Sequence, residues 1–170
     1  MPEPTPAPHP GAEVVVASAT DPRVVALVEA LTTELAGGGY SAEQTFGYSA
    51  ARLAASGVHL VAAEVDGEVD GEVGRRLVGL GGVEVEPDGE HAELKRFYVE
   101  PEHRGSGVAA AVLDALVDHA RRAGCRVLRL ETGDAQHAAL AFYRRHGFAD
   151  VDRFGPYVAS ATSVCLARTL

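Results

Sequence analysis

The sequence lacks the features that would place a protein in a membrane or export it. None of its apolar runs approaches the roughly 20 residues that a helix needs to cross a bilayer. The first 13 residues, MPEPTPAPHPGAE, have neither the basic start nor the apolar stretch of a secretory signal. We therefore expect a cytoplasmic protein with no membrane partner, in which residues 1–11 form a disordered, proline-rich extension and residues 12–170 form one domain.

Basic residues are also scarce, because 15 Lys and Arg stand against 24 Asp and Glu and give a formal net charge of -9. A protein that binds a nucleic acid backbone needs a clustered basic surface, so nucleic acid is not an expected partner. Acidity would favour cationic substrates through long-range attraction, although many proteins are acidic simply to stay in solution. The charge therefore excludes one class of partner more firmly than it selects another.

Neither cysteine nor histidine is arranged as a metal site. Cys125 and Cys165 have no ligand or redox spacing, and we expect two reduced, packed thiols. Four histidines in the second half of the chain also lack paired ligand spacing, and no metal is expected. They are His103, His119, His137 and His146.

The pattern of apolar residues predicts an α/β (α+β) domain. Short apolar runs between turn residues predict strands at 12–18, 58–65, 77–85, 92–99, 127–130, 149–153 and 163–168. Apolar residues at three- and four-residue steps predict helices at about 22–36, 42–55, 108–123 and 135–145. The segment between the second and third strands, VDGEVDGEVGRR, is interpreted as a solvated turn. The order is βααβββαβαββ, a mixed, mostly antiparallel sheet of about seven strands with helices on both faces.

A glycine-rich turn precedes the longest predicted helix. Its residues are Arg104, Gly105, Ser106, Gly107, Val108 and Ala109. Glycines allow the backbone to approach a ligand closely, and the free amides at a helix start favour a phosphate. Such a turn is often only a tight connection, so these six residues leave both interpretations open.

Two longer blocks resemble the GNAT superfamily of N-acetyltransferases. The string from Leu94 to Ala109, LKRFYVEPEHRGSGVA, is similar to the family's strand, x-Pro and Arg/Gln-x-x-Gly-x-Gly/Ala pyrophosphate loop. The string from Gln136 to Phe148, QHAALAFYRRHGF, is similar to its Asn-x-x-Ala-x-x-x-Tyr-x-x-x-Gly-Phe pattern. The resemblance is most specific over residues 93–148 and implies a single GNAT-like domain.

The resemblance implies where acetyl-CoA, the cosubstrate, would bind. The backbone of Phe97, Tyr98 and Val99 would bond the pantetheine arm where two parallel strands splay apart, and residues 104–109 would cradle the pyrophosphate through their amides. Gln136 stands where the family usually has asparagine and would be a further cofactor contact. Homodimers are common in the family, but no segment visibly encodes an interface.

The same resemblance suggests catalytic residues. Transfer to an amine requires removal of protons from the ammonium and stabilisation of the leaving thiolate. Tyr143 occupies the family's tyrosine position near the cofactor sulfur and is the predicted general acid. Glu93 is the first candidate for the general base, His91 lies on the same strand face as a reserve, and a water path is a third route.

The expected activity is transfer of an acetyl or other short acyl group from acetyl-CoA to a primary amine of a small molecule or peptide. The alternative is a non-catalytic acyl-CoA-binding regulator. A phosphate-transferring P-loop is disfavoured because Gly-Lys-Ser/Thr is missing. Four aromatic residues could line the acceptor pocket or simply pack on the sheet edge. They are Tyr40, Tyr48, Phe154 and Tyr157.

Overall fold

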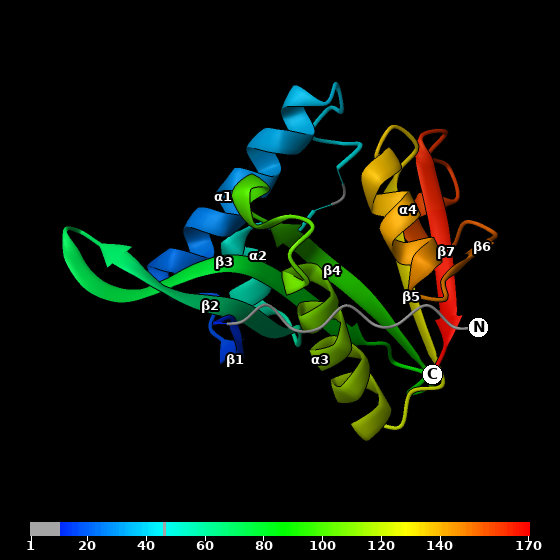
Figure 1. The fold of residues 1–170 in the computed structure, drawn as a ribbon. Helices are drawn as coiled ribbons and strands as arrows, with labels where there is room; N and C mark the ends of the chain where they lie inside the picture. The colour runs from blue at the N-terminus through cyan, green and yellow to red at the C-terminus, as the bar shows by residue number, and fades with distance from the viewer. Residues whose placement is uncertain (1–10, 46) are drawn as a thin grey trace.

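The computed structural model describes residues 11–45 and 47–170, whose strands form one sheet in the order β1-β2-β3-β4-β5-β7-β6 (Figure 1). The strands are β1 (Glu13–Ala17), β2 (His59–Val69), β3 (Glu72–Val85), β4 (His91–Val99), β5 (Val127–Gly133), β6 (Ala149–Val151) and β7 (Ser163–Thr169). The helices are α1 (Pro22–Gly37), α2 (Ala50–Ala55), α3 (Val108–Arg122) and α4 (His137–Arg145), with short 3₁₀ turns η1 (Pro101–His103) and η2 (Gly155–Tyr157).

The order of helices and strands confirms the predicted βααβββαβαββ and the mixed sheet. Of the extension predicted at 1–11, residues 1–10 lie outside the described residues. Within the ranges described, no helix is long and apolar enough to cross a bilayer. Both cysteines are buried and free, as predicted.

Strands β4 and β5 form the parallel pair at the centre of the sheet, and they stay together over a short distance. Their pairing covers only His91 to Glu93 against Val127 to Arg129. Beyond this point β4 continues beside β3, and β5 continues beside β7. Figure 1 shows the two strands diverging, with α4 over β5 and β7. Among the described residues, the divergence leaves the β4 edge without a strand partner beyond Glu93.

The sheet separates two apolar cores. One lies under α3 and α4, where Leu113, Leu116 and Leu128 are fully buried. The other lies under α1 and α2, where Val24 and Leu80 are fully buried. Burial of such side chains stabilises each layer by about 1.5–3 kcal/mol per residue. The helices therefore pack on both faces of the sheet, which holds β4 and its free edge in position.

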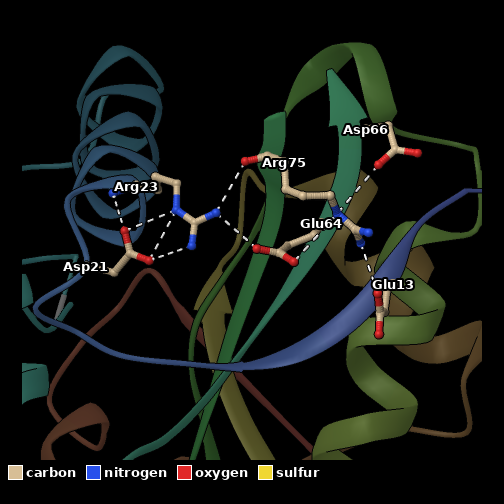
Figure 2. A network of polar contacts seen from close by, with 6 residues as sticks. All are labelled: Glu13, Asp21, Arg23, Glu64, Asp66 and Arg75. Carbon is tan, nitrogen blue, oxygen red and sulfur yellow. Dashed lines mark hydrogen bonds and ion pairs between the residues drawn. The ribbon is translucent and has the colours of Figure 1, made fainter. Parts of the chain in front are cut away.

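A network of charged side chains joins β1, β2, β3 and the start of α1 (Figure 2). Arg23 donates to Asp21 at 2.8 Å and to Glu64 at 3.0 Å, and the Asp21 side chain also caps α1 by accepting from the amide of Arg23. Arg75 lies 3.0 Å from Glu13 and 3.7 Å from both Glu64 and Asp66. Each arginine of this network is therefore matched by at least two carboxylates.

The solvated turn predicted at VDGEVDGEVGRR does join the two strands, but it is much shorter than expected. Strands β2 and β3 extend into this segment, and the connection is reduced to Asp70 and Gly71. Both residues have positive φ, 53° and 83°, which is the backbone that an Asp-Gly hairpin turn requires. Cross-strand pairing therefore extends the hairpin into a sequence whose composition alone indicates a loop.

The helix predicted at 42–55 is shorter than expected. Helix α2 begins only at Ala50, because the side chain of Ser49 accepts from the amide of Arg52 and caps it there. Residues 41–45 form turns in which Ser41 and Gln44 bond to each other. The residues before α2 instead line the candidate active site, to which they contribute Gln44, Thr45, Gly47 and Tyr48.

Candidate active site

A cavity of about 390 Å³ lies where β4 and β5 separate. Its walls come from β4, β5, α1, α4, η2, the start of α3 and the connection between α1 and α2. All five tyrosines of the chain line it, which is unusual because aromatic residues make up only 6% of the sequence. A cavity of this size is within the range of small-molecule sites.

The predicted pantetheine residues lie on the free edge of β4. Phe97, Tyr98 and Val99 all line the cavity. The Phe97 ring packs against the rings of Phe142 and Tyr143 at 5.8 and 5.9 Å between centroids. Because β5 pairs with β4 no further than Glu93, backbone groups on this edge are available to an extended ligand.

The predicted pyrophosphate loop forms the N-terminus of α3. Gly107 is the N-cap with φ of 89°, and no side chain in the described part of the chain caps the helix. The first-turn amides therefore remain available to an anion. Gly105 has φ of 72°, so both glycines occupy backbone conformations that other residues rarely adopt.

The six loop residues do not all face the cavity. Arg104, Gly105 and Ala109 line it, whereas Ser106, Gly107 and Val108 do not. Val108 is buried beneath the loop, and the Ser106 hydroxyl donates to the carbonyl of His103. Ser106, Gly107 and Val108 therefore stabilise the conformation of the loop and do not form the cavity wall.

The side chain of Arg104 is committed within the protein. Its Nε donates to the Val99 carbonyl at 2.9 Å, and Nη2 lies 2.6 Å from Glu34 Oε2. This pair joins the loop to α1. Gln136, the predicted cofactor contact on the other wall, lines the cavity at the start of α4 and makes no capping bond.

Tyr143, the predicted general acid, is buried and lines the cavity. Its ring contacts Phe142 and Phe148 edge-on at 5.4 and 5.5 Å. Burial raises the pKa of its hydroxyl far above the usual tyrosine value, so the hydroxyl stays protonated. It can therefore act as a neutral hydrogen-bond donor.

Glu93, the predicted base, is buried behind the cavity wall and does not line it. Its Oε1 accepts a 2.5 Å hydrogen bond from the Tyr157 hydroxyl and lies 2.8 Å from Lys95 Nζ. Burial and the bond to Glu93 raise the pKa of Tyr157. Because Lys95 and Tyr157 line the cavity, these two side chains connect the Glu93 carboxylate to it.

His91, the reserve base, lies outside the cavity. Its Nδ1 is 2.7 Å from Asp88 Oδ2, at the end of β4 that still pairs with β5. Hydrogen bonds from the backbone amides of His91 and Glu90, then from the His91 ring, lower the pKa of Asp88 to about 2. The ring is thus part of the turn before β4.

Five charged residues that line the cavity were missed as site residues, and three of them lie on strands β4 and β5. Those three are Lys95, Arg96 and Glu131. Burial raises the pKa of Glu131, and a 2.6 Å hydrogen bond from the Ser163 hydroxyl opposes this shift. The available signal was a set of charges inside otherwise apolar strands, where charged side chains are rare.

The aromatic expectations separate into two groups. Tyr40, Tyr48 and Tyr157 line the cavity, whereas Phe154 does not and instead lies under the Arg129 guanidinium, 3.9 Å from its ring centroid. The Tyr40 hydroxyl accepts from the Ala135 amide at 2.7 Å. It thereby joins the α1–α2 connection to the segment before α4.

A cavity between splayed parallel strands, beside a helix start with free amides, can hold an extended ligand that carries a phosphate group. Comparison with known proteins agrees, because residues 25–148 match the profile of the acetyltransferase (GNAT) family. The chain belongs to that family. It is an N-acetyltransferase.

Relatives match most of the chain. An IAA acetyltransferase of Azospirillum brasilense is 35% identical over 147 residues, covering 86% of this chain and 90% of the relative. An aminoglycoside N(6')-acetyltransferase type 1 of Stenotrophomonas maltophilia is 37% identical over 101 residues, covering 58% of this chain and 64% of the relative.

Solved structures share the fold. A Klebsiella pneumoniae protein thought to be an acyl-CoA N-acyltransferase superposes with a TM-score of 0.73 and 32% identity, covering 94% of this chain and 97% of that one. The PaiA N-acetyltransferase of Thermoplasma acidophilum, in complex with coenzyme A, superposes with a TM-score of 0.71 and 18% identity, covering 94% and 99%. The second likeness concerns the fold alone.

Proposed function

We propose that the protein transfers an acetyl or short acyl group from acetyl-CoA to a primary amine of a small molecule or peptide, by direct attack in a ternary complex. One observation carries this proposal: a single cavity is lined both by the predicted cofactor residues Val99 and Gln136 and by the polar residues Lys95 and Glu131. Two substrates bound at its two ends would meet without a covalent enzyme intermediate. The acetyl group would then pass in one step between them.

The cofactor end follows from the free edge and the helix start. The backbone of Phe97 to Val99 would bond the pantetheine arm, and the amides at the start of α3 would hold the pyrophosphate. Arg104 is paired with Glu34, so we assign its side chain to holding the loop against α1. Gln136 would add a contact from the start of α4.

In the reaction, the amine nitrogen attacks the acyl carbon, the C–N bond forms and the C–S bond breaks. Only the neutral amine attacks, so protons must leave the nitrogen. Glu93 would receive a proton through Tyr157 or a water molecule, because its carboxylate is one hydrogen bond behind the cavity surface. An unpaired backbone amide of β4 would stabilise the developing oxyanion.

The leaving sulfur faces a different requirement. Thiols ionise near a pKa of about 8.5, well below the raised pKa of Tyr143. Complete proton transfer from Tyr143 to the sulfur is therefore uphill, and a hydrogen bond is the favoured interaction. We assign Tyr143 as a donor that stabilises the departing thiolate, which later acquires its proton from solvent.

The cofactor assignment is tested by titrating the protein calorimetrically with acetyl-CoA, with free CoA and ATP as controls. Gly107 and Gly124 offer a matched pair, because both have φ of 89° and stand at opposite ends of α3. Leucine at either position introduces the same backbone strain. We expect Gly107→Leu to weaken acetyl-CoA binding by about 100-fold or more, and Gly124→Leu to retain it.

Equal affinities in the two variants would overturn the loop assignment. If leucine unfolds both proteins, the two alanine variants repeat the comparison with a smaller side chain. Binding of acetyl-CoA without thiol release in the presence of any amine would favour the non-catalytic regulator. A cytoplasmic location and a homodimer stay predictions.

A further inference from the structure

Four cationic side chains line the cavity, of which two form ion pairs and a third is exposed. Lys95 pairs with Glu93, Arg104 pairs with Glu34, and Arg145 is exposed to water. Arg96 is different because it is half-buried and, among the residues that the structure describes, forms no ion pair. Burial lowers the pKa of its guanidinium, and no neighbouring carboxylate counteracts that shift.

Arg96 does have two neutral partners. Its Nε donates to the Tyr48 carbonyl at 2.5 Å, and Nη2 donates to the Thr32 hydroxyl at 3.0 Å. These bonds hold the guanidinium in place against α1 and the α1–α2 connection. They leave both N–H groups of Nη1 without a partner in the described chain. A fixed guanidinium with unused donors matches the planar fork that binds a carboxylate.

The backbone at Arg96 is also unusual. Its φ is 51°, and it lies at a bulge where the pairing of β3 with β4 shifts between Leu80 and Gly82. A positive φ in a residue other than glycine is costly, and bulges of this kind often redirect a side chain near an active site. Gly47 lies against the guanidinium so closely that a Cβ there would overlap it.

The carboxylates that are not paired with an arginine lie elsewhere in the same site, whereas Glu34 is paired with Arg104. Glu131 lines the cavity from β5, and Glu93 lies behind Lys95 and Tyr157. A primary amine is cationic in water, so it is attracted to this carboxylate side, where its protons must be removed. One side of the cavity therefore combines two carboxylates with the single ammonium of Lys95 and attracts an incoming ammonium group, and the Arg96 guanidinium lies apart from it without an ion pair among the described residues.

From this arrangement we infer that the acceptor carries a carboxylate as well as its amine, and that Arg96 binds that carboxylate while the amine lies toward Glu131. The acceptor class is thus an amino acid or an amino-acid-like small molecule. This inference rests on the proposed function and narrows it. It also gives the bulge a role, because a regular strand would direct Arg96 away from Lys95.

The test compares matched acceptors by thiol release from acetyl-CoA. The probes are glycine, β-alanine, 4-aminobutanoate and 5-aminopentanoate, each against its primary amide. We expect the wild-type protein to prefer the acid over the amide by about 10- to 100-fold in kcat/KM for the chain length that fits. Amides acetylated as well as their acids would overturn the inference while leaving amine acetylation intact.

Substitutions test whether Arg96 is the residue that causes the preference for the acid. We expect Arg96→Gln to reduce the acid-over-amide ratio by about 10- to 100-fold. Arg52→Gln is the matched control, because Arg52 stacks on the Tyr48 ring at 3.9 Å but is exposed and does not line the cavity. If Arg96→Gln retains the wild-type ratio, Arg96 is only a clamp for Tyr48. If Arg96→Gln fails to fold, the inference is tested with Arg96→Lys and with the acid-over-amide ratio of the wild-type protein.

The two proposals fail differently. Acetyl-CoA binding followed by acetylation without carboxylate preference removes only the assignment of Arg96. Binding with no acetylation of any acid or amide removes the proposed amine acceptor together with the inference. A preference that persists in Arg96→Gln at unchanged acetyl-CoA affinity would transfer carboxylate binding to another residue and contradict the assignment.

Discussion

The network in Figure 2 and the charges of the cavity are built from the same residue types but are balanced differently. Around β1 to β3, Arg23 and Arg75 each contact at least two carboxylates. In the cavity, Arg96 contacts none among the described residues, and Glu131 accepts from a neutral hydroxyl. The first arrangement pairs its charges within the protein and joins neighbouring strands. In the cavity, Arg96 and Glu131 keep charges that a bound ligand could pair with.

The largest difference should appear when one glutamate is neutralised in each region. We expect Glu93→Gln to lower kcat by about 100- to 10,000-fold, because the site loses its proposed proton acceptor. Acetyl-CoA affinity should change little. Glu64→Gln removes the charge that pairs with Arg23 and Arg75 and should instead cost about 1 kcal/mol of unfolding free energy at unchanged kcat.

Both quantities are measured on both variants, kcat by thiol release and stability by urea unfolding. A similar kcat in the two variants would end the distinction between the regions and remove Glu93 from the mechanism. Glu93→Asp controls for geometry, since it keeps the charge and withdraws it from Tyr157.

A smaller effect is expected from a single hydroxyl. Tyr143→Phe removes the proposed donor to the sulfur and should lower kcat by about 10- to 100-fold, the strength of a hydrogen bond to a charged group. The ring packing against Phe142 and Phe148 is preserved, so acetyl-CoA affinity and thermal stability should remain close to wild type. An unchanged kcat would leave Tyr143 with a purely structural role.

The smallest effect is the opposite pH dependence of the two regions. The pKa of Asp21 is lowered, chiefly by its hydrogen bond with Arg23, so its contribution to stability is lost as pH falls below the usual aspartate range. The pKa of Glu131 is raised by burial, so folding becomes less favourable as pH rises above the usual glutamate value. Unfolding free energies measured against pH should show both slopes.

Two conservative variants assign these slopes. Asp21→Asn keeps an N-cap side chain on α1 but should flatten the acidic limb. Glu131→Gln should remove the decrease on the other side of the optimum. A profile unchanged by both substitutions would show that neither carboxylate governs stability, and the proposed contrast would fail at that level.

Much of the fold could be predicted because local patterns and packing agree. The apolar spacing of α3 matches the face that it buries, and the order of elements is confirmed throughout. The errors at β2–β3 and α2 arose where cross-strand pairing or a single serine cap overrides composition. Element ends depend on such partners, which a linear pattern does not contain.

The candidate site was predictable only in part. The glycine loop and Tyr143 are local motifs, and the structure brings Gln136, Arg104 and Tyr143 to one cavity. The bond between Glu93 and Tyr157 joins residues 64 positions apart, and no local pattern indicates it. The side to which Arg96 points depends on a bulge, which shifts a strand by one residue without a marker in the sequence.

The bulge in β4 has a consequence for how sequences of such proteins are compared. Lys95 lies 4.9 Å from the Tyr48 ring and Arg96 donates to the Tyr48 carbonyl, so two consecutive residues serve one face of a strand. Strand residues normally alternate between faces. A related chain could keep both letters in its alignment yet, with a regular strand, present only one of them to its acceptor. Two proteins with the same residues at these positions could then have different acceptor substrates.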